Sequence, residues 1–169
     1  MGKQIIIYYS RTGENYFDGK IRRIEKGNTE IAAEIIKELT GADSFRVVQK
    51  NPYSDNYSKC TEEAHDDQRI GRRPELIAYP ESLDGYDVVY LGYPNYWSTM
   101  PMAMFTLLEH SSLKGKTIKP FCTHEGSGMG CSTDDIKKLC PDSIVKEGLA
   151  IRGSNAHESR KEIERWIRN

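Results

Sequence analysis

The chain has 169 residues, of which 37% are hydrophobic and 29% are charged, and its formal net charge is −1. The length suits one domain with a sizeable core, so we expect a single domain over residues 1–169. The near-zero charge gives no electrostatic basis for binding nucleic acid or an anionic membrane surface, and no apolar stretch is long enough to cross a bilayer. Nucleic acid and membrane partners are therefore not expected.

Apolar runs alternate with amphipathic stretches along the chain, beginning directly after the N-terminus. The apolar runs predict strands at Gln4–Tyr9, Ser44–Val48, Asp87–Gly92, Thr117–Thr123 and Ile144–Ile151. The stretches between them predict helices at Asn28–Leu39, Tyr57–Gly71, Met102–Glu109, Ser132–Leu139 and His157–Ile167. Such alternation is typical of an α/β fold in which a doubly wound, five-stranded parallel sheet lies between two layers of helices.

Several residues mark the ends and faces of these helices. Gly41 follows the first helix and predicts its C-cap. Ser132 and Asp135 are three residues apart and resemble a capping box with Asp in place of Glu. In the last helix Trp166 and Ile167 share an apolar face with Ile163, so we expect them to point toward the core.

The cysteines indicate a reducing compartment. The four of them lie at positions 60, 122, 131 and 140, and none forms a C-x-x-C pair. Reduced thiols are expected. The N-terminal residues show no signal-peptide pattern, so a cytoplasmic location is expected.

In a doubly wound sheet the ligand lies beyond the carboxyl ends of the strands, so three loops matter most. The loop after the first strand contains Ser10, Arg11 and Thr12, and Asn28 and Thr29 stand where the next helix begins. Hydroxyls and the free N–H groups of a helix N-terminus form an anion site. This loop therefore predicts a phosphate site.

The loop after the third strand contains Pro94, Asn95, Tyr96 and Trp97. Two adjacent aromatic residues could form a lid over the core. At a ligand site, either ring could instead stack on a planar ligand, which is worth roughly 0.5–1.5 kcal/mol for a well-formed pair. The position of the loop favours a role in ligand binding.

The loop after the fourth strand contains Thr123, His124, Glu125, Gly126, Ser127 and Gly128. Its glycines allow the backbone to approach a ligand edge closely. His124–Glu125 resembles the start of a zinc signature, but no second His follows at the required spacing, so no metal site is expected. His124 could orient a ligand or exchange protons, or it could be an ordinary surface residue.

Together the three loops describe a pocket for a phosphorylated, planar heterocycle. Ser10–Gly13 and Gly27–Thr29 together resemble the S-x-T-G-N-T phosphate loop of flavodoxins, split by an insertion. The other two loops resemble the flavin loops of that family, and the resemblance covers essentially the whole chain. It implies a short-chain flavodoxin fold, with strand order 2-1-3-4-5 and FMN as the cofactor.

The resemblance also implies a role for each site residue. The FMN phosphate would be held by Ser10, Thr12, Asn28 and Thr29, while Arg11 points outward. The ribityl chain and one face of the ring would be lined by Pro94, Asn95, Tyr96 and Trp97. The ring edge would be bordered by Thr123, His124, Glu125, Gly126, Ser127 and Gly128. No residue is assigned a catalytic role.

The Glu14–Lys26 segment departs from the family pattern. Asp18–Gly19 predicts a turn, so the segment is expected to form a small β-hairpin. It carries a basic cluster at Lys20, Arg22, Arg23 and Lys26. This cluster is either a solvated charged face or a docking surface for an acidic partner or for the phosphate of a pyridine nucleotide.

The leading functional prediction is an FMN-binding flavodoxin that transfers electrons at low potential between redox partner proteins. The alternative is an FMN-dependent NAD(P)H oxidoreductase of the quinone reductase type. A monomer or a weak dimer is expected. A P-loop hydrolase is disfavoured because no G-x-x-x-x-G-K-[ST] motif is present. A response-regulator domain would need acidic residues after the first strand, and the hydroxyls and aromatics of the loops argue against a relative without a ligand.

Overall fold

The computed structural model describes residues 2–169 and contains a central parallel sheet. Its strands are β1 (Lys3–Tyr8), β4 (Asp43–Arg46), β5 (Tyr86–Pro94), β6 (Thr117–His124), β7 (Ile144–Val145) and β8 (Leu149–Arg152). They pair in the order β4-β1-β5-β6-β7, and β8 also pairs with β6. This arrangement confirms the predicted α/β fold and its strand order.

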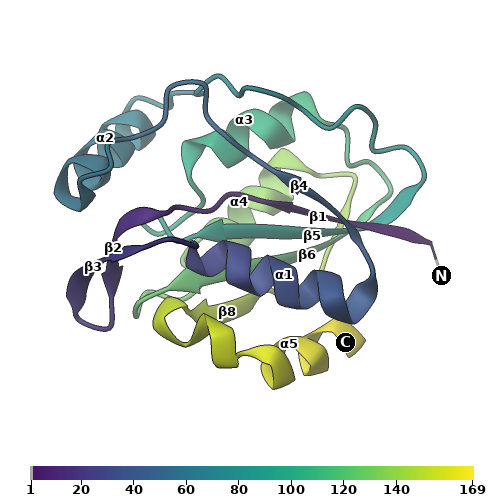
Figure 1. Ribbon diagram of the computed structural model, residues 1–169. Coiled ribbons are helices and arrows are strands. Elements are labelled where there is room, and N and C mark those ends of the chain that lie inside the picture. The colour runs from purple at the N-terminus through teal and green to yellow at the C-terminus, as the bar shows by residue number, and fades with distance from the viewer. Residues whose placement is uncertain (1) are drawn as a thin grey trace.

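Helices cover both faces of the sheet (Figure 1). Helices α1 (Asn28–Thr40) and α5 (Arg160–Arg168) pack on one face, and α3 (Met102–His110) and α4 (Ser132–Leu139) on the other. The alternation of side chains along β1 explains the two layers, because Ile6 joins the α1–α5 core while Ile5 and Ile7 join the α3–α4 core. Strands buried on both faces read as continuous apolar runs.

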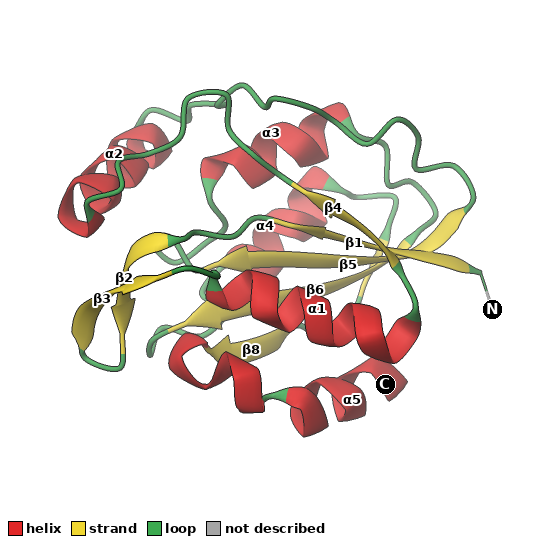
Figure 2. Cartoon of the chain, in the orientation of Figure 1, coloured by secondary structure: helices red, strands yellow, loops and turns green. Residues whose placement is uncertain are grey.

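Two further elements lie beyond the carboxyl ends of the strands. They are the hairpin of β2 (Gly13–Phe17) and β3 (Lys20–Ile24), and helix α2 (Tyr57–Arg69). Figure 2 shows both at the same end of the sheet, opposite the N-terminus. The predicted hairpin is therefore confirmed, and it lies at the carboxyl end of the sheet, where the sequence predicts the ligand site.

The prediction of one continuous fifth strand is wrong. The segment forms two short strands, β7 and β8, which pair with successive parts of β6. The carbonyl of Glu147, between them, accepts a hydrogen bond from the indole N–H of Trp166 at 3.0 Å. This carbonyl therefore bonds to α5, and the register with β6 shifts by one residue between β7 and β8.

Two predictions about helix ends are also wrong. The last helix does not begin at His157, because Gly153–Glu158 form a 3-10 helix (η1) and α5 begins only at Arg160. Ser132 does not cap α4, since its hydroxyl donates to the Met129 carbonyl at 2.6 Å and accepts from the Tyr93 hydroxyl at 2.8 Å. The predicted cap at Gly41 is confirmed by its left-handed backbone (φ 69°) and its N–H bond to Lys37.

The remaining predicted elements begin and end within two residues of those observed. The inward positions of Ile163 and Trp166 are confirmed, since both belong to the α1–α5 core, and Ile167 packs against that core. Across residues 2–169, no helix is both long enough and apolar enough to cross a membrane.

Candidate functional site

A cavity of about 380 Å³ opens at the carboxyl end of the sheet. Its wall contains eleven residues predicted for the site: Arg11, Asn28, Thr29, Pro94, Asn95, Tyr96, Thr123, His124, Glu125, Gly126 and Ser127. These residues come from the β1–β2 connection, the start of α1, and the ends of β5 and β6 with the loops that follow. The fold therefore brings the three predicted loops together around one space, which we call the first cavity.

Four predicted residues lie off this wall. Ser10 and Thr12 border a separate depression that also contains Arg46. Trp97 lines a neighbouring cavity, described below. Gly128 contributes its carbonyl, which accepts a hydrogen bond from the Asn95 amide at 2.8 Å.

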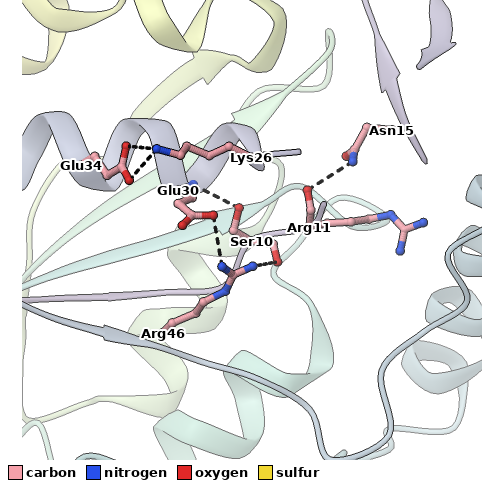
Figure 3. Close-up of polar contacts among 7 residues, drawn as sticks. All are labelled: Ser10, Arg11, Asn15, Lys26, Glu30, Glu34 and Arg46. Atoms are coloured by element: carbon pink, nitrogen blue, oxygen red, sulfur yellow. Dashed lines mark hydrogen bonds and ion pairs between the residues drawn. The ribbon is translucent and has the colours of Figure 1, made fainter. Parts of the chain in front are cut away.

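The start of α1 carries the features of an anion site. The N–H of Glu30 donates to the Ser10 hydroxyl at 3.1 Å (Figure 3). The N–H groups of Asn28 and Thr29 have no carbonyl within the helix to bond. Gly27 precedes them, and a Cβ at this position would collide with the Ser10 hydroxyl and the Arg11 backbone. The two halves of the split loop therefore meet at Gly27. The N–H groups of Asn28 and Thr29, at the start of the helix, are available to an anion.

The cations near this helix start are already paired. Lys26 contacts Glu34 at 2.8 Å, and Arg46 contacts Glu30 at 3.1 Å (Figure 3). The Arg11 guanidinium points away from α1. An anion here would be held mainly by N–H groups and the helix dipole.

Arg11 instead stabilises the surrounding loops. Its side chain donates to the backbone carbonyls of Glu14 and Asp55, at 3.0 and 2.9 Å. It therefore connects the β1–β2 segment to the loop before α2 while still lining the first cavity.

A buried pair of hydroxyls connects α1 to β6. The Oγ1 atoms of Thr29 and Thr123 lie 2.7 Å apart, and both residues are almost fully buried. One hydroxyl donates to the other, so the pair keeps one O–H for another acceptor. The contact fixes the start of α1 against the strand that carries the third loop.

His124 lies on the cavity wall in a defined orientation. Its Nδ1 accepts a hydrogen bond from the N–H of Gly126 at 2.9 Å, so the neutral ring carries its proton on Nε2. Burial lowers the pKa of His124; the nearby Glu125 carboxylate opposes this shift, and Arg152 acts in the same direction as burial. At neutral pH the ring is therefore a neutral hydrogen-bond donor at the cavity.

This geometry predicts a pH-dependent stability. The folded protein disfavours protonation of His124, so the unfolded chain takes up the proton first, and the free energy of unfolding should fall as pH drops below about 7. His124→Asn keeps an acceptor for the Gly126 N–H but cannot titrate. Urea unfolding of both proteins between pH 8 and 5 should show a steeper loss for the wild type, and parallel curves would contradict the assignment.

The carboxylate of Glu125 is satisfied within the protein. It accepts hydrogen bonds from the N–H and the hydroxyl of Ser154, at 2.7 and 3.2 Å, and it lies 3.5 Å from Arg152. Its side chain is only 13% exposed. The third loop is thus fixed to the start of η1, and this negative charge is balanced by Arg152.

The two aromatic residues of the second loop face different spaces. The Tyr96 ring packs edge-on against Tyr9 at 5.9 Å and lines the first cavity. The Trp97 ring stacks on His65 of α2 at 4.3 Å, and its indole N–H donates to the Thr61 carbonyl at 2.9 Å. Of the two candidates for ring stacking, Tyr96 is therefore the one on the wall of the first cavity.

Comparisons with known proteins identify the family of this chain. The family model described as Flavodoxin matches residues 23–169. The chain belongs to the flavodoxin family. A solved structure from Bacteroides eggerthii, assigned as a flavoprotein, is 30% identical to this flavodoxin, with a TM-score of 0.77 over 99% of this chain and 97% of that one.

Two more distant structures share the fold. A flavoprotein of Lactobacillus acidophilus in complex with FMN is 19% identical, with a TM-score of 0.66 over 94% of this chain and 98% of that one. Oxidised flavodoxin 2 from Bacillus cereus is 15% identical, with a TM-score of 0.54 and 98% coverage of both chains. A comparison with curated proteins gives no significant match.

Four residues of this flavodoxin's first cavity were missed by sequence reasoning, namely Asn15, Tyr16, Tyr57 and Gly153. Gly153 follows the last strand at its carboxyl end, so the rule that located the other loops could have found it. The other three come from the hairpin and α2, whose positions depend on contacts between distant segments. These polar stretches have no periodic pattern, so the sequence gives no signal that they line the first cavity.

Among residues 2–169, the cysteine and acidic side chains form no cluster suited to a metal ion. All four thiols are free, and only Cys131 is exposed. Its pKa is raised by partial burial and by Asp135, so the thiol stays protonated at neutral pH. Within the described part of this flavodoxin, no group of three or more His, Cys, Asp or Glu side chains could hold a metal ion.

Proposed function

We propose that this flavodoxin binds FMN in the first cavity and transfers electrons at low potential through the bound flavin. The observation that carries the proposal is the start of α1, where the N–H groups of Asn28 and Thr29 have no partner within the helix and both residues line a cavity of about 380 Å³. The relative from Lactobacillus acidophilus that shares the fold is a complex with FMN. FMN supplies the redox chemistry, while the protein binds and orients the cofactor.

The residues present fit each part of the cofactor. The phosphate suits the start of α1, since a helix N-terminus favours an anion. The ring suits the space between Tyr96 and the 124–127 loop, where His124 offers its Nε2–H and glycine allows a close approach. The buried Thr29–Thr123 pair holds these two ends of the cavity at a fixed spacing.

Electron transfer between protein partners is the role that we propose first. A net charge of −1 gives little long-range steering, so a partner would be recognised through local contacts at the cavity mouth. An FMN-dependent NAD(P)H oxidoreductase is the second candidate. A second cavity that adjoins the first specifically favours it, because small reactants need a space beside the flavin.

Two measurements test the proposal. FMN should bind the apoprotein much more tightly than riboflavin, which lacks the phosphate, and fluorescence titration measures both affinities. Equal affinities would overturn the anion site at α1. An anaerobic visible spectrum of the holoprotein, recorded before and after adding NADPH or NADH, then separates the two roles. Persistent yellow colour supports the carrier, and rapid bleaching supports the oxidoreductase.

A further inference from the structure

A second cavity, of about 420 Å³, adjoins the first one. Both are lined by Arg11, Asn15, Tyr57, Asn95, Tyr96 and Ser127, so they are compartments of one hollow. The remaining wall comes from α2 and from the loop that carries Trp97. We call this compartment the α2 chamber.

The inserted hairpin holds the N-terminal end of α2. The Glu14 carboxylate accepts a hydrogen bond from the Tyr57 N–H at 2.8 Å, and the Tyr16 and Tyr57 rings stack at 6.2 Å. Arg23 forms an ion pair with Asp55 at 2.6 Å, just before the helix. The insertion that splits the phosphate loop thus forms the support of the chamber, and Arg23 belongs to that support rather than to a free basic surface.

The Trp97 loop holds the rest of the helix. Besides the stacking on His65 and the bond to Thr61, the Gln68 amide donates to the Trp97 carbonyl at 3.0 Å. Trp97 and Ser98 both have left-handed backbones, with φ of 55° and 70°. Such conformations are strained for residues other than glycine and persist where surrounding contacts impose them, often at ligand sites. Here Trp97 is held by its contacts with α2, and Ser98 by hydrogen bonds with Asn95 and Cys131.

The chamber wall has a defined chemistry. Its apolar part comes from Cys60, Ala64, Tyr96 and Trp97, and its lining contains no carboxylate. Tyr57 lines both compartments, and its hydroxyl has no hydrogen-bond partner within residues 2–169. Small-molecule sites are typically concave and mostly apolar, with a few polar groups that fix orientation. The volume also falls in the usual range for such sites.

We propose that the α2 chamber binds a small, uncharged planar ring bearing a carbonyl oxygen, beside the flavin. The ring would pack against Ala64 and Trp97, and its carbonyl would accept a hydrogen bond from Tyr57. This inference rests on the proposed function, because the shared wall places such a ring next to the cofactor. A free quinone and the nicotinamide ring of a reduced dinucleotide share this chemistry.

Calorimetric titration of the FMN-loaded protein with tetramethyl-1,4-benzoquinone tests the chamber. This quinone is chosen because its fully substituted ring resists addition of the Cys60 and Cys131 thiols. Ala64→Trp fills the chamber and should raise the Kd of the quinone at least tenfold, while the Kd of FMN stays within twofold. Glu62→Trp places the same ring on the exposed face of α2, and it should leave both constants unchanged.

The outcomes are distinct. The chamber is overturned if the quinone has the same Kd in wild type and Ala64→Trp, or if neither ring binds. In both cases FMN binding would still support the proposed function. Failure of FMN to bind overturns both. Reduced nicotinamide mononucleotide is titrated in parallel. If it binds and Ala64→Trp weakens its binding, the ring is that of a nicotinamide; if only the quinone behaves in this way, the ring is that of a quinone. If Ala64→Trp does not fold, Tyr57→Phe provides the second variant and should weaken binding by loss of one hydrogen bond.

Discussion

Replacing Gly27 with alanine is expected to raise the Kd of FMN by at least about tenfold, which corresponds to about 1.4 kcal/mol. The added Cβ would meet the Ser10 hydroxyl and would lie 2.6 Å from the Arg11 carbonyl oxygen and 3.0 Å from the Arg11 nitrogen. Backbone atoms cannot rotate away as a flexible side chain can. The Ser10–Thr12 loop would therefore separate from α1, and the N–H groups that face the phosphate would lose their orientation.

Gly41→Ala is the matched control for this prediction. Gly41 lies at the other end of α1, and its positive φ of 69° makes alanine unfavourable there as well. The control should therefore lose stability without losing affinity for FMN. Fluorescence titration of FMN, with urea unfolding of each apoprotein, separates the two effects. If Gly27→Ala binds FMN as the wild type does, the phosphate does not lie at the start of α1.

The sheet and the three loops could be predicted because their signals are local. The apolar run at Ile5–Tyr8 is long enough to identify a strand buried on both faces, and the polar residues after it lie at its carboxyl end by necessity. The same reasoning located the loops at Asn95 and His124. The position of a strand fixes the position of the residues that directly follow it, so sequence alone places these residues near the cavity.

The use of each side chain could not be predicted in the same way. Ser10 accepts from the Glu30 N–H, and Thr29 pairs with Thr123, which lies 94 residues away along the chain. Sequence shows that these hydroxyls exist but not which partner each will find. Trp97 is the clearest example of a side chain whose partner could not be predicted, since the direction of its ring depends on the position of α2. That helix is held by the hairpin and the Trp97 loop, and also by the hydrogen bonds of Tyr53 and Ser54 with its side chains.

Replacing Gly92 with alanine is expected to destabilise the protein by about 1–3 kcal/mol, as overpacking of a close-packed core does. Gly92 of β5 lies directly opposite Phe121 of β6, and a Cβ at Gly92 would collide with the Phe121 ring. The ring is fully buried and packs edge-on against Trp166 at 6.2 Å, so it has no space to move into. Urea unfolding of the apoprotein measures the loss.

A double-mutant cycle with Phe121→Leu shows whether this contact is the cause. Leucine shortens the opposing side chain, so Phe121→Leu should destabilise the wild type but offset part of the loss in Gly92→Ala, and the double variant should be more stable than the sum predicts. Additive effects would show that the strain arises elsewhere. Because β5 and β6 lead directly to Tyr96 and His124, affinity for FMN should fall in Gly92→Ala and recover in the double variant. Such a recovery would show that the packing of two central strands sets the width of the cavity.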